Sequence, residues 1–570
     1  MRKRQVHQQT CMRIRIDLTS GFCGNAGSTI AAAMLAMFSC YQSAHALSVS
    51  NLAAYQVIQR TSDRTADITA RGSCNASVRS IEFQVAQQGG AILSGFSWKS
   101  AGATIANLSW SCLLKALPVG GEYTISMRGV DASGAVVDAA LTIGHILVGD
   151  IWIASGQSNI GGTSEAATYA YCHGCTVWSP WALANHNLSV SFARTMYEKT
   201  GVPQGIAIVC CSGCGIVSWD PGQGSLDGGY GICDMIDKVN GSIKGFIWYQ
   251  GETDAESYQD GGVRAFGYRK KLQTLLANVR THAGNPALPC LIVQIGNTYP
   301  PGSIVVRGTQ FDLSITDPNV ATIPVYDLTA ELHLSAAGQD TAGKRLGLAF
   351  LREFAGLTEY AYGPRFESAW FKDAQRQDIM VKLANVKDSL VNYASDPERY
   401  GFFILDTALW RKNDSTLDFS YTTPAGMLMA IDTITRLAPD KLNLRLKAPV
   451  TVPVTISYGR SGSPAFSGVR HMKPVTDGTN IPMPTFFNYP VLMTEPVSAI
   501  RSESDEHAHY SSLAPALKSF QNFGSMTANM LACNGRVIPR HGSMIQPNVT
   551  TGVYLSQQHL RRLLLKNCPE

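Results

Sequence analysis

The chain has 570 residues, too many for one hydrophobic core, so roughly three or four domains are expected. Charged residues make up only 16% of the sequence and the formal net charge is +5, so there is no strong basic or acidic footprint. This composition argues against nucleic acid as a partner, and the hydrophobic fraction of 45% is typical of a soluble globular protein.

Residues 1–46 predict a secretory signal peptide. The basic runs MRKR and MRIR precede a short apolar stretch, STIAAAMLAMFSCY (28–41), and Ala44-His45-Ala46 follows as a small-residue cleavage site. A membrane anchor needs roughly 20 apolar residues, and no later segment is long and apolar enough to span a bilayer. We therefore expect cleavage after Ala46 and a secreted or periplasmic mature chain without a membrane span.

Eleven of the 14 cysteines follow this signal peptide. In an oxidising compartment the default is disulfides, and the odd number leaves at least one thiol unpaired within the chain. Domain position predicts two pairs, Cys74 with Cys112 and Cys533 with Cys568. Two further C-x-x-C pairs permit either loop-closing disulfides, which we favour beside a strand end, or a zinc site with four thiolate ligands. These pairs are Cys172 with Cys175 and Cys211 with Cys214.

The pattern of apolar residues divides the remaining chain into four parts. Residues 47–145 alternate short apolar runs with turn residues, which predicts an N-terminal β-sandwich. Over 146–356, helical patterns alternate with buried-strand patterns such as VPQGIAIVCC, which predicts a parallel sheet covered by helices on both faces. Residues 357–500 return to β-type sequence and predict a second β-sandwich. Residues 501–570 form a C-terminal extension without a clear pattern before QQHLRRLLLKN.

Four predicted strands of the 146–356 region end in small or polar residues. In a parallel α/β sheet, functional groups gather at the carboxyl ends of the strands. Serine hydrolysis needs a nucleophile, a base and donors to the oxyanion, and these strand ends supply a candidate for each. Taken alone, Ser158 is more typical of a turn, but four such ends in one domain favour a nucleophile. The segments are VGDIWIASGQSN (148–159) with Ser158, IAIVCCSGCGIVSW (206–219) with Gly213, IKGFIWYQGETDA (243–255) with Gln250, Glu252 and Asp254, and VYDLTAELHLSAAGQ (325–339) with Asp327, Glu331 and His333.

The serine does not lie in the usual α/β-hydrolase motif. The signature G-x-S-x-G is absent because position 160 is Ile, and Glu331 and His333 share one short segment rather than being far apart. This order of residues points to a different fold.

The blocks VGDIWIASGQSN, CSGCGIVSW, IKGFIWYQGETDA and ELHLSAAGQ resemble those of SGNH-hydrolase carbohydrate esterases, most closely the sialate O-acetylesterase-like group. The flanking stretches LLKALPVGGEYTISMRG and VTISYGRSG resemble the N-terminal sandwich and the C-terminal β-domain of that group. The resemblance implies an α/β fold: an SGNH-hydrolase, flavodoxin-like three-layer α/β/α catalytic domain flanked by β-sandwich domains.

The same resemblance implies roles for individual residues. Ser158 becomes the nucleophile and His333 the general base, with the N–H groups of Ser158 and Gly213 and the side chain of Gln250 as oxyanion donors. Relatives carry an Asp two or three residues before the His, whereas here position 330 is Ala and position 331 is Glu. Glu331 orients His333, or Asp327 does so, or the Ser–His pair works with a carbonyl alone. The second block is Cys-Ser-Gly-Cys-Gly where relatives have a Trp-Gly-Gly-Thr-like run, which changes the shape expected for the acyl pocket.

The sequence therefore predicts a serine esterase that removes O-acetyl groups from carbohydrates, without a cofactor or a metal. An alternative is a catalytically degenerate carbohydrate-binding or surface-attachment protein. A third hypothesis, a secreted or phage-type protein that acts on acetylated surface polysaccharide, shares the chemistry of the first.

Overall fold

The structure is a computed structural model. It describes residues 46–161, 172–176, 182–183, 188–220, 229–239, 241–256, 263–296, 302–328, 332–360, 362–391, 401–406, 427–428, 431–459 and 474–496. The predicted C-terminal extension, residues 501–570, lies outside the described residues. The predicted signal peptide lies outside them too, apart from Ala46. No helix in the described ranges combines the length and apolar character needed to cross a membrane.

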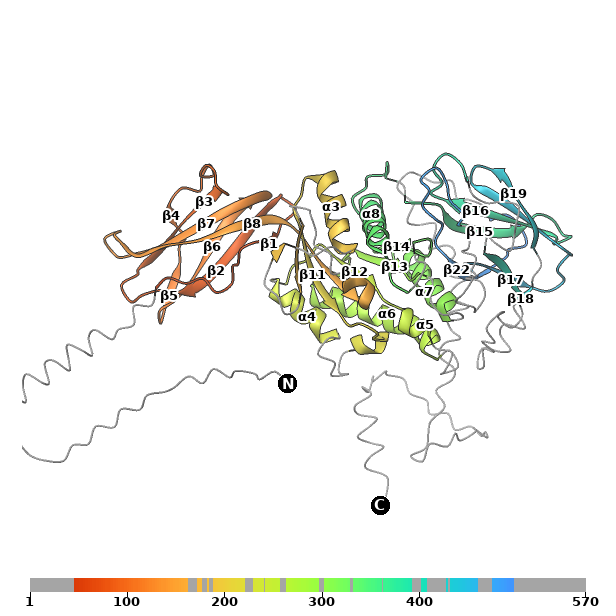
Figure 1. Cartoon of the computed structure of the whole chain (residues 1–570), viewed down its shortest axis with the longest axis horizontal. Helices are drawn as coiled ribbons and strands as arrows, with labels where there is room; N and C mark the ends of the chain where they lie inside the picture. The colour runs from red at the N-terminus through yellow and green to blue at the C-terminus, as the bar shows by residue number, and fades with distance from the viewer. Residues whose placement is uncertain are drawn as a thin grey trace, which may run out of the picture. The chain divides into compact units, whose positions relative to one another are not determined.

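The first eight strands form two sheets around one hydrophobic core (Figure 1). A three-stranded antiparallel sheet has the order β2-β6-β5, and β4, β3, β7 and the first part of β8 form the other, with β1 parallel to β8. Every second residue of β3 is buried, and Phe83 of β3 shares the core with Ile68 of β2. The bounds are β1 (Val57–Gln59), β2 (Thr65–Ser73), β3 (Ser80–Gln87), β4 (Lys99–Ser100), β5 (Thr104–Ala106), β6 (Ser109–Pro118), β7 (Gly120–Val130) and β8 (Val136–Gly156).

The predicted disulfide between Cys74 and Cys112 is wrong, because both residues are free, buried thiols. Strands β2 and β6 are antiparallel with Ser73 opposite Ser109, and the N–H of Cys74 donates to Leu108 O. Cys112 therefore lies four residues further along β6, roughly 13 Å away, whereas a disulfide needs Cα atoms within about 7 Å. The predicted pair Cys533–Cys568 lies outside the described residues.

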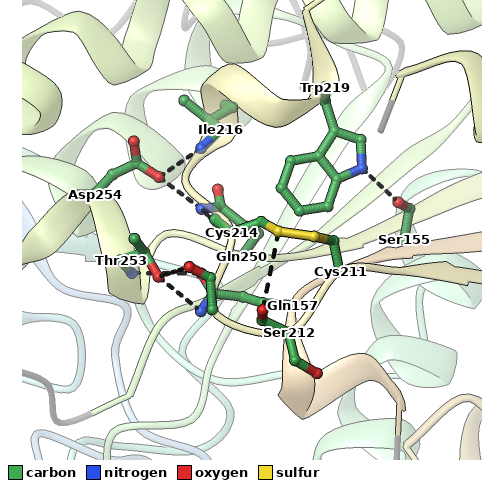
Figure 2. Close-up of a disulfide and its surroundings, with 11 residues drawn as sticks. Ser155, Gln157, Cys211, Ser212, Cys214, Ile216, Trp219, Gln250, Thr253 and Asp254 are labelled. Carbon is green, nitrogen blue, oxygen red and sulfur yellow. Dashed lines mark hydrogen bonds between the residues drawn. A yellow bond between two sulfur atoms is a disulfide. The ribbon is translucent and has the colours of Figure 1, made fainter. Parts of the chain in front are cut away.

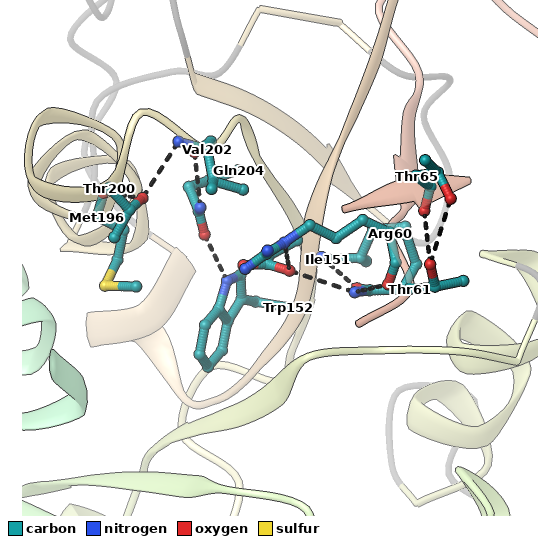
Figure 3. Close-up of polar contacts among 11 residues, drawn as sticks. Arg60, Thr61, Thr65, Ile151, Trp152, Met196, Thr200, Val202 and Gln204 are labelled. Carbon is teal, nitrogen blue, oxygen red and sulfur yellow. Dashed lines mark hydrogen bonds and ion pairs between the residues drawn. The ribbon is translucent and has the colours of Figure 1, made fainter. Parts of the chain in front are cut away.

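Strand β8 runs through the predicted domain boundary at residues 145–146. Its first part pairs with β7. Its residues 150–156 pair with β11 (Gln204–Cys210) and its residues 152–156 with β12 (Gly245–Tyr249) of the parallel sheet. Most residues from 136 to 145 of the strand are at least partly exposed, whereas every residue from 146 to 156 is buried. This change is expected where a sheet becomes covered on both faces. Figure 3 shows the region where this change occurs: Arg60 forms an ion pair with Asp150 at 2.9 Å, and Trp152 Nε1 donates to Gln204 Oε1 at 2.8 Å.

The predicted parallel sheet is confirmed, with the strand order β10-β9-β11-β8-β12-β13-β14. All its described neighbours are parallel except β10, which is antiparallel to β9. Strands β12, β13 and β14 are short and completely buried, which explains their continuous apolar sequences. Their bounds are β9 (Cys172–Thr176), β10 (Ala182–Leu183), β11 (Gln204–Cys210), β12 (Gly245–Tyr249), β13 (Cys290–Gln294) and β14 (Val320–Pro324).

Helices cover both faces of this sheet, as Figure 1 shows. Trp152 of β8 packs edge-on against Phe192 of α3 and Phe350 of α8, so these two helices share a face. Trp248 of β12 packs against Trp219 of η1 and donates to Tyr268 of α6 on the opposite face, where α7 packs against α6. The bounds are α2 (Ser158–Gly161), α3 (Leu188–Thr200), the 3-10 helix η1 (Ile216–Trp219), α4 (Gly229–Lys238), α5 (Glu252–Ala255), α6 (Val263–His282), α7 (Gly302–Thr316) and α8 (Ala336–Glu353).

The strands after α8 form two four-stranded antiparallel sheets, ordered β15-β16-β20-β19 and β18-β17-β21-β22. Buried polar contacts join them to the parallel-sheet region. Gln294 exchanges two 2.8 Å hydrogen bonds with the backbone of Thr485, and the hydroxyls of Tyr326 and Tyr458 lie 3.0 Å apart. The bounds are β15 (Arg365–Phe371), β16 (Asp378–Ala384), β17 (Phe402–Asp406), β18 (Met427–Leu428), β19 (Ile431–Ala438), β20 (Lys441–Leu446), β21 (Val454–Tyr458) and β22 (Phe486–Pro490).

Candidate active site

Ser158 stands at the carboxyl end of β8 because the chain turns sharply at Gly156. Gly156 has a φ of +147°, and a Cβ at this position would lie only 1.9 Å from Tyr249 O of β12. Only glycine accommodates both this φ and this close approach. The N–H of Gln157 then donates to the same Tyr249 carbonyl at 3.1 Å, and Ser158 begins the short helix α2, half-buried.

The structure brings Ser158 and His333 into direct contact across 175 residues of sequence. Ser158 Oγ lies 2.8 Å from His333 Nε2. His333 is exposed and lies between β14 and α8, two residues before Ser335, whose Oγ accepts a 3.2 Å hydrogen bond from the N–H of Gly338. Ser335 thus caps the N-terminus of α8. A serine hydroxyl at this distance from an imidazole nitrogen is suited to proton transfer between them.

The sequence predicted that Glu331 or Asp327 orients His333, and the structure describes only Asp327. Glu331 lies outside the described residues. Asp327 is described, and both its oxygens accept hydrogen bonds from Arg345, at 2.8 and 2.6 Å. This bidentate ion pair fixes the end of the β14 segment to α8, so the structure assigns Asp327 to Arg345 rather than to His333.

Gly213 lies in a four-residue loop after β11 that a disulfide closes (Figure 2). Cys211 and Cys214 are bonded to each other, so their sulfurs are not available to the alternative four-thiolate zinc site, and the loop-closing disulfide predicted for this pair is confirmed. Gly213 has a φ of +72°, its carbonyl accepts from Thr253 Oγ1 at 3.1 Å, and the N–H of Cys211 donates to Gly156 O at 3.0 Å. The loop is therefore fixed to the ends of both β8 and β12.

Gln250 does not have the contacts predicted for an oxyanion donor. Its side chain is fully buried, and Nε2 donates to Asp254 Oδ2 at 2.6 Å and to Cys214 O at 3.1 Å. Asp254 Oδ2 also accepts from the N–H of Ile216 at 2.8 Å, as Figure 2 shows. Both amide hydrogens are thus used to hold residues 214–216 in place. In the structure Gln250 therefore supports the loop that carries Gly213, and its role as an oxyanion donor stays a prediction.

The sequence assigned no role to Gln157, Asn159 or Thr253, yet these residues connect the strand ends. Gln157 Nε2 donates to Thr253 Oγ1 at 3.2 Å, and Thr253 in turn donates to the Gly213 carbonyl. Asn159 bonds to the Glu252 side chain and to the backbone next to His333. All of these residues lie in the quoted GQSN and GETD segments, so the sequence located them but gave no sign of their partners.

Glu252 and Asp254 are the buried carboxylates of this group, each with 2% of its surface exposed. Loss of solvation raises the pKa of the Glu252 carboxyl to about 7, and the hydrogen bond from Asn159 opposes that rise. Burial also raises the pKa of Asp254. Near neutral pH the Glu252 carboxyl is therefore partly protonated, which lowers the cost of its burial.

The parallel sheet lies between two layers of helices, and a serine contacts a histidine at the carboxyl edge of the sheet. This three-layer α/β/α fold with its serine–histidine contact is typical of hydrolases. Residues 148–352 match the family model described as carbohydrate esterase, sialic acid-specific acetylesterase. The resemblance predicted from the sequence is therefore confirmed over residues 148–352, which are similar to this carbohydrate esterase family.

Individual proteins are also similar to this chain. A protein of Arabidopsis thaliana described as a probable carbohydrate esterase is 27% identical over 154 residues, which cover 26% of this chain and 56% of that protein's length. The crystal structure of a carbohydrate acetylesterase from Xanthomonas citri superposes with a TM-score of 0.53 at 21% identity, covering 77% of this chain and 99% of the other. This second similarity concerns the fold.

Proposed function

We propose that the protein is a serine esterase that removes O-acetyl groups from carbohydrates, with Ser158 as nucleophile and His333 as general base. The observation that carries this proposal is the 2.8 Å contact between Ser158 Oγ and His333 Nε2 at the carboxyl edge of the parallel sheet. The carbohydrate esterase family of residues 148–352 supports the choice of an acetylated sugar as substrate.

In this mechanism Ser158 Oγ attacks the acetyl carbonyl carbon while His333 Nε2 takes its proton. The negative charge on the carbonyl oxygen is stabilised by the N–H groups of Ser158 and Gly213. The carbon–oxygen bond to the sugar then breaks, and the sugar oxygen takes the proton from His333. Water, deprotonated by His333, attacks the acetyl-Ser158 ester; the bond to Ser158 Oγ breaks, Oγ takes the proton back from His333, and acetate is released.

Replacing Ser158 by Ala tests this proposal. We expect Ser158→Ala to lower kcat for p-nitrophenyl acetate by about 10⁴-fold or more, because the nucleophile is lost. Ser126→Ala, at a half-buried serine of β7 in the N-terminal sheets, is the matched control and should keep wild-type kcat. Unchanged hydrolysis by a folded Ser158→Ala protein would contradict the mechanism.

The substrate is tested by acetate release from a panel of O-acetylated glycans. The family description favours O-acetylated sialic acid, to be compared with acetylated xylan and acetylated bacterial polysaccharide. If the wild-type protein binds these glycans but releases no acetate from any of them or from p-nitrophenyl acetate, the degenerate carbohydrate-binding alternative is correct.

We also propose that the chain is exported and that the two groups of antiparallel sheets on either side of residues 146–356 are β-sandwich domains. The order of basic residues, short apolar stretch and Ala44-His45-Ala46 supports export. The core shared by the two N-terminal sheets supports the first sandwich. A mature protein that begins at Leu47 when recovered from the periplasm or medium is the expected result.

A further inference from the structure

The residue that follows the proposed nucleophile holds the backbone on both sides of His333. Asn159 Nδ2 donates to Leu332 O at 3.2 Å, and Asn159 Oδ1 accepts from the N–H of Leu334 at 3.1 Å. These two groups belong to the residues immediately before and after His333. One amide side chain, attached to the backbone next to Ser158, thus binds both flanks of the residue that contacts Ser158.

The second hydrogen of the Asn159 amide fixes the orientation of this amide. Nδ2 also donates to Glu252 Oε1 at 2.8 Å, so both N–H hydrogens and the carbonyl oxygen are used. Asn159 and Glu252 are each 2% exposed, so water does not compete for these bonds. If the Asn159 amide were rotated by 180°, Oδ1 would face two acceptors, Glu252 Oε1 and Leu332 O. The amide therefore keeps Nδ2 towards Leu332 and Oδ1 towards Leu334.

Residues 332–334, which contain His333, bury few side chains that could fix their position. His333 is exposed and 39% of the Leu332 surface is exposed, although Leu334 is buried. A segment with exposed side chains samples several positions unless its backbone is bound. The hydrogen bond between a nucleophile and its base weakens steeply with distance and angle, so the position of the His333 backbone controls the contact with Ser158 Oγ.

We infer that Asn159 is a positioning residue for the proposed reaction: by binding Leu332 O and the Leu334 N–H, it keeps His333 Nε2 within reach of Ser158 Oγ. This inference rests on the proposed function. Because Asn159 is buried and next to the nucleophile, it acts on the proton transfer rather than on the binding of the sugar.

The test compares Asn159→Ala with Asn75→Ala. Asn75 has the same pattern of bonds elsewhere: Nδ2 donates to Asp138 Oδ1 and to Val137 O, and Oδ1 accepts from the N–H of Ser77. We expect Asn159→Ala to lower kcat by about 100-fold with KM changed little, because a displacement near 1 Å costs about that much. Asn75→Ala should lower the melting temperature about as much as Asn159→Ala does, but it should keep wild-type kcat.

A second variant and a second readout keep the test independent of folding and of the substrate. Asn159→Asp keeps the acceptor for the Leu334 N–H but, when ionised, has no hydrogen for Leu332 O, so kcat should also fall. The rate at which a fluorophosphonate labels Ser158 should fall in parallel, since that reaction needs the Ser158–His333 pair and no sugar.

The outcomes separate the inference from the proposed function. Slow labelling of Asn159→Ala with normal labelling of Asn75→Ala supports the positioning role, even if no acetylated sugar is a substrate of the wild type. Wild-type kcat and labelling in folded Asn159→Ala, or equal losses in both Ala variants, overturn the role. A wild type that a fluorophosphonate does not label at Ser158 overturns both proposals.

Discussion

The two ring nitrogens of His333 have different roles in the proposed mechanism, and among the described residues only Nε2 has a contact. Nε2 faces Ser158 Oγ, while the partner that fixes the tautomer must bind Nδ1. We expect Glu331→Ala to lower kcat/KM less than His333→Ala, because His333→Ala removes the proton acceptor itself whereas Asn159 still holds the backbone when Glu331 is lost. Measuring kcat/KM of both variants on p-nitrophenyl acetate checks this order.

The control for this comparison is Asp327→Asn. It weakens the ion pair with Arg345, so it should lower the melting temperature without shifting the pH profile of kcat/KM. If Glu331→Ala and His333→Ala lose equal activity, the carboxylate is as necessary as the base, and the smaller role we assign to Glu331 is wrong.

The buried carboxyl of Glu252 makes stability depend on pH. Desolvation raises its pKa from the usual 4.5 to about 7 in the folded protein. Below pH 4.5 both folded and unfolded states hold the proton. Between pH 4.5 and 7 only the folded state holds it, so this group lowers the stability progressively as the pH rises, and its full penalty is present above pH 7.

Glu252→Gln therefore should stabilise the protein more at pH 8 than at pH 5, by about 3 kcal/mol at most. The Gln side chain has no charge to bury and keeps an oxygen that accepts from Asn159 Nδ2. Urea unfolding of the two proteins at both pH values measures the difference. A stability difference that does not change with pH would show that the Glu252 carboxyl does not titrate between these values in the folded protein.

At the scale of elements, the loops after β8, β11 and β12 act as one assembly. The disulfide closes the loop that carries Gly213, and Thr253 Oγ1 binds its carbonyl. We expect the double variant Cys211→Ser, Cys214→Ser to lower kcat by up to about 100-fold, since a less fixed Gly213 N–H stabilises the oxyanion less well. The assay compares kcat with and without dithiothreitol.

The double variant also serves as the control for reduction. Wild-type kcat should fall with dithiothreitol towards that of the double variant, whose own kcat should not respond. A response of the double variant to dithiothreitol would assign the effect to another cysteine, and a wild-type kcat in the double variant would show that the disulfide does not position Gly213.

The sequence predicted those elements whose signal lies within one segment. The apolar runs of β11, β12 and β13 indicated buried parallel strands because both faces of the sheet are covered. The sequence also located the ends of the strands. It thereby predicted that Ser158 and His333 lie close together, as the structure shows. Partners across the sheet could not be predicted: Gln250 donates its amide hydrogens to Asp254 and Cys214, and this choice depends on side-chain positions that one sequence does not reveal.

The errors at the scale of strands have the same origin. Domain position suggested a disulfide between Cys74 and Cys112, but the register of β2 and β6 separates the two cysteines along the strand. Register depends on which faces of two strands are buried together, and this is a property of the pair rather than of either sequence. The predicted boundary at 145–146 lies within β8, whose backbone continues through it.

At the scale of the whole molecule, β8 is a structural link between the N-terminal sheets and the sheet that carries Ser158. The same strand pairs with β7 before residue 149 and with β11 and β12 after it. At the transition, both Asp150 oxygens accept from Arg60, and the N–H of Ile151 donates to Gln59 Oε1 at 2.7 Å. Neither sheet can lose β8 without exposing the core of the other, so the two should unfold together.

Arg60→Ala tests this coupling. Asp150 is 2% exposed, so removal of Arg60 leaves a buried carboxylate without its ion-pair partner, and we expect a loss of about 3 kcal/mol in the free energy of unfolding. The matched control is Arg128→Ala, which breaks the more exposed pair with Glu82 and should cost less than about 1 kcal/mol. Because β8 is shared, urea should abolish esterase activity and amide protection of β7 at the same midpoint, and Arg60→Ala should lower both equally. If Arg60→Ala exposes the amides of β7 while activity keeps its wild-type midpoint, the two sheets unfold independently and β8 does not couple them.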